Sequence, residues 1–369
     1  MTFFLGIHTF EYMWLPKAIK TALLAGMGVL LFPVSLQAQD VPGPDHVVDT
    51  IDIYLDIFDE EYPMELTLKL DLKKYQREKF RGEYIPAECQ YHINDTFKLE
   101  HQIRIKARGN FRRQHCSFAP FWLNIRKADV ENPHLQNINR IKVVTHCNGG
   151  RSYADYVLKE YLAYRIYNLL SPVSFRVRLV KMRYVDTGRR NKVIENWAFM
   201  IEPEELLAER LQGIAVERDD LSMRHMVAED MDRVAQFMYM IGNPDYSVYG
   251  RHNIKVLGVG NYGGRGYTPV PYDFDYSGLV NTYYAIPGEE LGIESVRERY
   301  YLGACRSDQA YQRAMDYLAG HREEILDLVQ EFPLIDDKVK KDMVTYLESY
   351  FNEAEGRNFI KYRLRSTCR

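Results

Sequence analysis

Apolar and polar residues alternate along much of the first half of the chain. The segments 64–72 (MELTLKLDL), 99–107 (LEHQIRIKA) and 138–146 (INRIKVVTH) show this alternation, which is the pattern of strands with one buried face. Segments 175–186 (FRVRLVKMRYVD) and 192–205 (KVIENWAFMIEPEE) repeat it on either side of a short polar stretch. We therefore predict a β-rich first part whose last two strands form a hairpin.

Helical spacing replaces the alternation in two places. In the stretch 152–171 (SYADYVLKEYLAYRIYNLLS), apolar side chains recur every three to four residues, and Asp155 and Glu160 are expected on or near the solvent side. From Pro203 to about Phe359 the pattern is mostly helical, interrupted by short strands around a glycine-rich turn. Strands, one helix, a hairpin and then helices predict an α+β fold with a strand-rich first part and a helical second part.

The N-terminal residues have the order of a secretory signal. Lys17 and Lys20 precede an apolar run over 21–34, and small and polar residues follow it up to Ala38. The run is shorter than the roughly 20 residues of a membrane-spanning helix. We expect 1–38 to be a signal peptide, removed to leave a periplasmic or extracellular protein with no stable membrane span. A retained membrane anchor is the alternative.

Charge and cysteine content narrow the function classes. The chain has 369 residues and a net charge of −3, without the basic runs that are typical of nucleic-acid binding, so no nucleic-acid partner is expected. Its five cysteines are an odd number, so at least one is free or paired with another chain. The others permit one or two disulfides, whose connectivity the sequence does not give, and none has the spacing of a zinc site.

Two acidic motifs in the second half indicate a metal–phosphate site. The motif GNPDYSVYGRHNIKVL contains Asp245 and Asn253, and VPYDFDYSG contains Asp273 and Asp275 at alternate positions of a predicted strand end. Alternate strand residues point the same way, and the glycine-rich turn between the motifs would fold the second back beside the first. Oxygen ligands of this kind suit Mg²⁺ or Mn²⁺. The alternative is that these residues cap turns or are solvated.

The same motifs resemble those of the CotH kinase-like family. The resemblance rests on the RGN turn at 108–110 and on the PYDFD stretch at 271–275, and it covers roughly residues 100–285, which include the turn with Asp245 and Asn253. The turn is also similar to the C-lobe motifs of HipA-like kinases, although Asp245 and Asn253 stand further apart here than in most of them.

This resemblance implies a two-lobed atypical kinase-like fold. A β-rich segment (39–100) and a kinase-like N-lobe (101–202) would precede a mainly helical C-lobe (203–369). In such a fold Asp245 is the catalytic residue that positions the acceptor hydroxyl. The implied ligands of the Mg²⁺ or Mn²⁺ ion are Asn253, Asp273 and Asp275. His252 is either a phosphate contact or a structural imidazole.

The resemblance also implies a site for ATP or another nucleotide. Lys142 would contact the phosphates, Glu160 on the following helix would hold Lys142, and Glu202 would meet the adenine edge through its backbone or side chain. Because the predicted N-lobe, 101–202, has no GxGxxG loop, the arginines of ARGNFRR, among them Arg108, would replace it. The structural alternatives are an ordinary strand lysine, an exposed helix acid and a solvated hairpin tip.

The function expected from these motifs is that of a secreted, metal-dependent kinase-like phosphotransferase. Its acceptor would be a hydroxyl of a protein, a saccharide or a lipid. Two alternatives stay open because ATP is scarce outside the cytoplasm. One is an inactive kinase-like binding module of the cell envelope, and the other is a metal-dependent hydrolase that uses the same carboxylates.

Overall fold

A closed barrel of seven strands forms the strand-rich part of the protein in the computed structural model. The strands follow the order β1-β2-β3-β4-β5-β7-β6, and the barrel closes where β1 pairs in parallel with β6. Their bounds are β1 Met64–Leu70, β2 Ile85–His92, β3 Lys98–Ala107, β4 Phe121–Ile125, β5 Ile141–Val144, β6 Val177–Asp186 and β7 Lys192–Ile201. The structure describes residues 57–59, 62–92, 98–125, 140–259 and 266–369, which all lie in the contact unit spanning 52–369.

The alternation in the sequence explains the barrel. On β1, Leu66, Leu68 and Leu70 are buried in the barrel core, whereas Glu65 points outward. The hairpin of β6 and β7 forms as predicted, over ten paired residues on each strand. Strands from the predicted β-rich segment (39–100) and from the predicted N-lobe (101–202) therefore share one barrel and one core.

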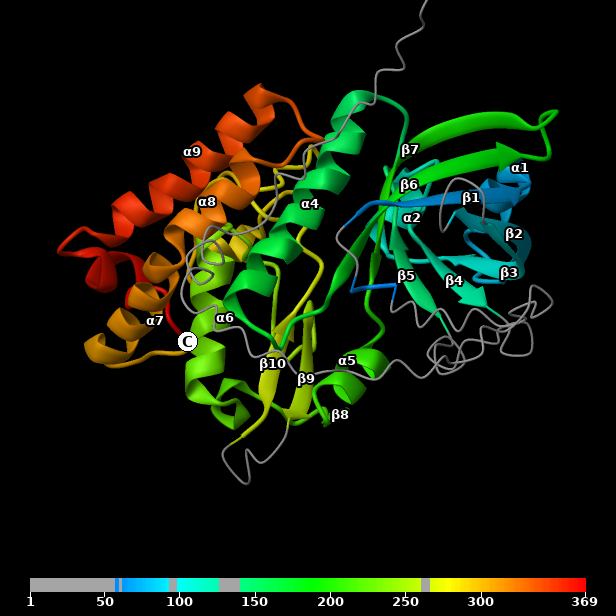
Figure 1. The fold of residues 1–369 in the computed structure, drawn as a ribbon. Helices are drawn as coiled ribbons and strands as arrows, with labels where there is room; N and C mark the ends of the chain where they lie inside the picture. Colours follow the sequence, from blue (N-terminus) through cyan, green and yellow to red (C-terminus); the bar gives the residue numbers. More distant parts are fainter. Residues whose placement is uncertain (1–56, 60–61, 93–97, 126–139, 260–265) are drawn as a thin grey trace, which may run out of the picture. The chain divides into compact units, whose positions relative to one another are not determined.

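A second hydrophobic core surrounds α4 and the helices that follow the barrel. Figure 1 shows α4 between the barrel strands and helices α6 to α9. The helices are α1 Leu72–Glu78, α2 Phe111–His115, α4 Arg151–Leu170, α5 Glu204–Arg210, α6 Ala228–Met240, α7 Asp308–Gly320, α8 Arg322–Gln330 and α9 Asp337–Ala354. The mixed α+β class is thus confirmed.

Helix α4 differs from its prediction in one respect. It forms over the expected residues, but strands cover one side of it and helices cover another, so apolar and charged residues are buried together. Glu160 was expected on or near the solvent side and is only 2% exposed. The expectation is wrong because a helix packed on two sides has no single buried stripe.

A small sheet in the order β10-β9-β8 supports both acidic motifs. Its strands are β8 Gly213–Ala215, β9 Ile254–Val259 and β10 Thr268–Pro271. Strands β9 and β10 are antiparallel, with Ile254 opposite Pro271. The second motif is therefore folded back beside the first, as the sequence predicts, while the turn at 260–265 lies outside the described residues.

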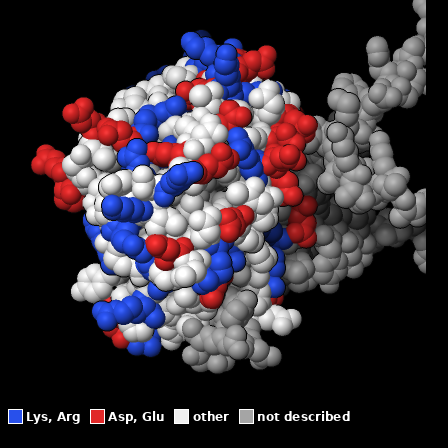
Figure 2. Space-filling model, turned by 90° about the vertical axis from the view of Figure 1, so that its left-hand side faces the viewer, with Lys and Arg blue, Asp and Glu red and all other residues white. Residues whose placement is uncertain are grey.

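Two disulfides join Cys116 to Cys147 and Cys305 to Cys368, and Cys89 is free and buried. Disulfides persist in oxidising compartments, so the pairing indicates a protein outside the cytoplasm. No helix in the described part of the chain is both long and apolar enough to cross a bilayer. The predicted signal peptide, 1–38, lies outside the described residues. Figure 2 shows basic and acidic side chains interspersed on the face that it displays.

Candidate functional site

The turn between α6 and β9 holds Asp245, His252 and Asn253 in one hydrogen-bonded group. Asn253 has a positive φ of 51°, a conformation that asparagine adopts more easily than most residues. Its Nδ2 donates to the Asp245 backbone oxygen at 2.8 Å and to Oδ2 of Asp245 at 3.1 Å. The His252 Nε2 lies 2.8 Å from Oδ1 of Asp245. The turn thus fixes a half-exposed carboxylate between an amide and an imidazole.

Asp273 lies beside this turn. The backbone N–H of Tyr272 donates to the Asn253 oxygen at 3.0 Å, and the Asp273 N–H donates to the Tyr164 hydroxyl of α4 at 2.8 Å. Asp273 has a φ of 64°, which is uncommon for a non-glycine residue and typical of functional sites. No side chain in the described ranges hydrogen-bonds or ion-pairs with its carboxylate.

Asp273 and Asp275 do not extend a strand, contrary to the prediction. Strand β10 ends at Pro271, and the positive φ at Asp273 turns the chain. Asp275 is buried and binds Arg112, whose Nη2 is 2.7 Å and whose Nε is 2.8 Å from Oδ2. Among the residues described, no three histidine, cysteine, aspartate or glutamate side chains converge on a metal position. The three carboxylates therefore do not share one metal position among the described residues, and Arg112 holds Asp275.

Arg112 is the centre of a buried ionic network. Its Nη2 also lies 2.6 Å from Oε2 of Glu160, and the Tyr284 hydroxyl donates to Asp275 at 2.8 Å. Glu160 was expected to pair with Lys142, and the structure corrects this pairing to Arg112. The pKa of Glu160 is raised to about 8, chiefly by burial; Arg112 opposes this shift, and Asp275 and Asp273 add to it.

The network has more negative than positive groups within it. One guanidinium faces the two carboxylates of Glu160 and Asp275, and the second oxygen of Glu160 is buried without a partner in the described structure. Burial also raises the pKa of Asp275. We therefore expect one proton to be shared between these two carboxyl groups at neutral pH.

Lys142 on β5 faces aromatic rings instead of an acid. Its ammonium lies 4.6 Å from the Tyr272 ring centroid and 5.7 Å from those of Trp122 and Phe175. Burial, assisted by Arg108, lowers its pKa to about 8, and Asp273 opposes the shift. No acidic side chain in the described ranges forms an ion pair with it. A buried cation of this kind is suited to an anionic ligand.

Arg108 and Lys142 both lie against the ring of Trp122. The Arg108 guanidinium stacks on Trp122 at 5.4 Å from the ring centroid, and its backbone N–H donates to the Pro120 oxygen at 2.8 Å. The positive charge of Arg108 works to lower the pKa values of Lys142, Tyr164 and Tyr272. The early RGN turn and the later acidic motifs thus meet around Asp273.

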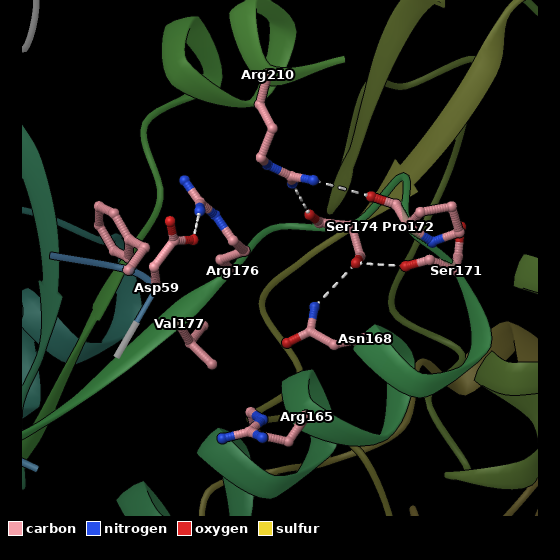
Figure 3. A pocket seen from close by; sticks show the side chains of 10 residues that line it. Asp59, Arg165, Asn168, Ser171, Pro172, Ser174, Arg176, Val177 and Arg210 are labelled. Carbon is pink, nitrogen blue, oxygen red and sulfur yellow. Dashed lines mark hydrogen bonds and ion pairs between the residues drawn. The ribbon is translucent and has the colours of Figure 1, made fainter. Parts of the chain in front are cut away.

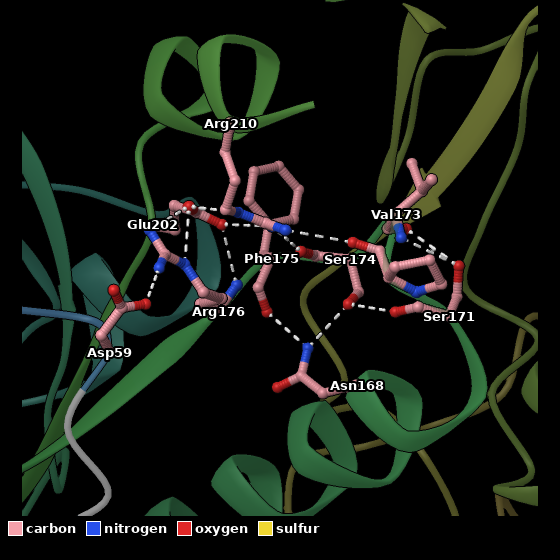
Figure 4. Close-up of polar contacts among 10 residues, drawn as sticks. Asp59, Asn168, Ser171, Val173, Ser174, Phe175, Arg176, Glu202 and Arg210 are labelled. Carbon is pink, nitrogen blue, oxygen red and sulfur yellow. Dashed lines mark hydrogen bonds and ion pairs between the residues drawn. The ribbon is translucent and has the colours of Figure 1, made fainter. Parts of the chain in front are cut away.

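Glu202 directly follows β7, and both its carboxylate and its backbone N–H have hydrogen-bond partners within the protein. Its buried carboxylate accepts hydrogen bonds from Arg176 and from Arg210 (Figure 4). The shortest of these bonds is 2.9 Å, from Arg176 Nε. The Glu202 backbone N–H donates to the Arg176 oxygen at 2.9 Å. The predicted contact with an adenine edge would therefore have to use the carbonyl oxygen of Glu202.

A run of aromatic rings borders the site and was not predicted from the sequence. It links α2, the N-terminal part of α4 and the segment after Asp275 through successive ring contacts, with centroids 4.0–6.5 Å apart. Its members are Phe111, His115, Tyr153, Tyr156, Tyr276, Tyr283 and Tyr284. The sequence signal was the tyrosine-rich stretch YDFDYSGLVNTYY. Tyr276 connects the run to the acidic residues. Burial raises the pKa of its hydroxyl most, and the charges of Asp275 and Asp245 both add to this rise.

The free energy of unfolding is expected to fall as pH rises from 5 to 8. In the folded protein Glu160 has a pKa of about 8 instead of 4.5, so it keeps a proton that the unfolded chain has already released. The slope from one such group is at most about 1.4 kcal/mol per pH unit. Urea unfolding of the wild type and Glu160→Gln without divalent metal measures it, and the variant should show the flatter slope. A His252→Gln variant isolates that imidazole's contribution, and equal slopes in the wild type and Glu160→Gln would contradict the prediction.

The comparisons with known proteins found likeness in structure but no family. No protein-family model matches the chain, and no curated protein matches it. The proinflammatory kinase CtkA of Helicobacter pylori is similar in structure, with a TM-score of 0.36 and 12% identity, over 63% of this chain and 90% of that chain. At this TM-score and identity, the likeness carries no conclusion about the site.

Proposed function

We propose that this protein is a secreted kinase-like phosphotransferase with a two-lobed, CotH-like architecture. The observation that supports this best is the convergence of three segments on Asp273. Tyr272, the residue before Asp273, is hydrogen-bonded to Asn253. The negative charge of Asp273 favours the protonated forms of both Lys142 and His252. A basic group for phosphates and a fixed carboxylate for an acceptor thus lie near one acid that has no side-chain partner in the described residues.

The donor set at Asn253 and Asp273 fits Mg²⁺ or Mn²⁺. The Oδ1 of Asn253 and the carboxylate of Asp273 are hard oxygen donors to which no group in the described ranges donates a hydrogen bond. Magnesium is usually held by one or two protein ligands together with phosphate oxygens and water. Such an ion neutralises phosphate charge during transfer. Asp275 was also predicted as a ligand, and we propose instead that it anchors Arg112.

The remaining residues divide between nucleotide and acceptor. Lys142 and Arg108 would bind the phosphates of ATP or another nucleotide, with Trp122 and Tyr272 forming the apolar walls. Asp245 would accept a hydrogen bond from the acceptor hydroxyl, since Asn253 and His252 hold its carboxylate in place. The hydrogen bond to Asp245 raises the pKa of His252, which favours the imidazolium beside this carboxylate.

Export is part of the proposal. The order of Lys17, Lys20 and the apolar run predicts a signal peptide, and the two disulfides agree with an oxidising compartment. A periplasmic or extracellular kinase needs a nucleotide supply at its own location. The second candidate function is therefore an inactive kinase-like binding module, and the aromatic run beside Asp275 favours it because exposed rings such as Tyr283 can stack on a ligand.

Lys142→Met is expected to weaken Mg²⁺–nucleotide binding about ten-fold or more, because a charge-assisted contact is lost. The variant should fold at least as stably as the wild type, since it removes a buried charge that has no acidic partner in the described structure. Calorimetry with a non-hydrolysable ATP analogue measures the affinity. Lys181→Met is the matched control, because Lys181 is an exposed strand lysine that pairs with Glu65. Equal affinities for the wild type and Lys142→Met would exclude Lys142 from the site.

A further inference from the structure

A cavity of about 300 Å³ lies between α4, the start of β6 and α5, outside the set of residues proposed for transfer. Three arginines line it, Arg165, Arg176 and Arg210, together with one acid, Asp59. Figure 3 shows the three guanidinium groups around the cavity, coming from α4, from the residue before β6 and from α5. The three arginines could not be grouped from the sequence, because they are up to 45 positions apart.

Glu202 builds this cluster by holding two of the guanidiniums. Its carboxylate is fully buried behind the cavity and binds Arg176 and Arg210 together. Arg210 is further fixed by the backbone oxygens of Ser174 and Pro172, at 2.9 and 3.2 Å. Two cations are therefore oriented before any ligand arrives, which lowers the entropy lost on binding.

The cavity also has an apolar part and a polar amide. Phe58, Pro172 and Val177 belong to its lining. Asn168 donates to Ser174 Oγ and to the Phe175 oxygen, both at 2.9 Å, so its amide is fixed beside the arginines. A volume near 300 Å³ exceeds that of an inorganic anion and is at the lower end of small-molecule sites.

Asp59 forms an ion pair with Arg176, an arginine that a ligand could bind in its place. Its side chain is 67% exposed and forms an ion pair with Nη1 of Arg176. An ion pair made with an exposed acid contributes little to stability. An incoming oxyanion can therefore replace Asp59 at small cost and reach Arg165 across the cavity.

We propose that this cavity is a binding site for a small organic oxyanion, a carboxylate or phosphate group on a compact apolar body. The guanidinium fork matches both groups in a bidentate manner. Phe58, Pro172 and Val177 would contact the apolar body. The site is separate from the nucleotide position, although the two share a wall, since Phe175 packs on Lys142 and the next residue, Arg176, lines the cavity.

Calorimetry on the mature protein with benzoate, phenyl phosphate and benzyl alcohol tests the proposal. The two anions are expected to bind with a saturable isotherm, and the neutral alcohol is not. The comparison of benzoate with phenyl phosphate decides between the carboxylate and the phosphate source. Arg165→Gln should weaken binding about ten-fold, and Asp59→Asn should strengthen it several-fold because the competing carboxylate is gone.

Two controls make the outcome specific. Lys142→Met should leave anion binding unchanged, which separates this site from the proposed nucleotide site. Arg183→Gln, an exposed arginine of β6 paired with Glu195, should also have no effect. Failure of both anions to bind the wild type would overturn the proposal. An unchanged affinity in Arg165→Gln, or in Asp59→Asn if the first variant does not fold, would overturn it as well.

Discussion

Asp245→Asn is expected to lower phosphoryl transfer by about 10²–10⁴-fold while Mg²⁺–nucleotide affinity stays nearly unchanged. The carboxylate is held by Asn253 and His252 and is half-exposed, so it is placed to accept a hydrogen bond from an acceptor hydroxyl. An amide at this position has one oxygen and one donor group, so it orients the hydroxyl poorly. Because Asp245 is not among the proposed metal ligands, nucleotide affinity should not follow activity.

Transfer of labelled phosphate from ATP to the protein itself or to an added hydroxyl acceptor measures the rate, and calorimetry measures the affinity. Asp219→Asn is the control, because Asp219 is an exposed acid near the same turn that pairs with Arg251. Equal transfer rates in the wild type and Asp245→Asn would remove Asp245 from the mechanism. A parallel loss of rate and affinity would place it at the metal instead.

Arg112→Met is expected to lower the free energy of unfolding by about 3–5 kcal/mol, the usual cost of breaking a buried ion pair from one side. The substitution leaves Glu160 and Asp275 buried beside one another with no cation between them. It also removes the group that joins α2 to α4 and to the segment after β10. The loss should be the largest among single substitutions in this site.

Urea unfolding at neutral pH measures the loss, with Arg104→Met on β3 as the control, because Arg104 is exposed and bonds Asn124. Adding Glu160→Gln and Asp275→Asn to Arg112→Met should restore part of the stability, since no buried charge then remains. A loss below about 1 kcal/mol in Arg112→Met would contradict the buried network.

The local elements could be predicted from the sequence because their signals are local. Period-two alternation predicted the hairpin of β6 and β7, and helical spacing predicted α4. The pairing of β1 with β6, which closes the barrel, joins Leu66 to Met182. Alternation is compatible with many partners and does not specify this one. The predicted boundary at residue 100, between the β-rich segment and the N-lobe, falls within strand β3 of this barrel.

The site was predicted in part for the same reason. Asp245, Asn253 and Asp273 are close in sequence and flank the two adjacent strands β9 and β10, so their meeting followed from one turn. Glu160 and its partner Arg112 are 48 positions apart, and no spacing rule connects a helix acid with a particular arginine. Lys142 was predicted as the partner of Glu160 by analogy with kinases. In the structure, aromatic rings surround Lys142.

The central claim is that Asn253 and Asp273 hold a metal–nucleotide complex, and melting curves of the wild type and Asp273→Asn test it most directly. Mg²⁺ or Mn²⁺ with nucleotide at 100 times its Kd should stabilise the wild type by about 2.7 kcal/mol. Asp273→Asn should lose this shift, and without ligand it should be as stable as the wild type or slightly more so, because one unpaired acid near Glu160 and Asp275 is gone. No metal- or nucleotide-dependent shift in the wild type, together with early melting of Asp273→Asn in every condition, would show that the turn is scaffold and contradict the account.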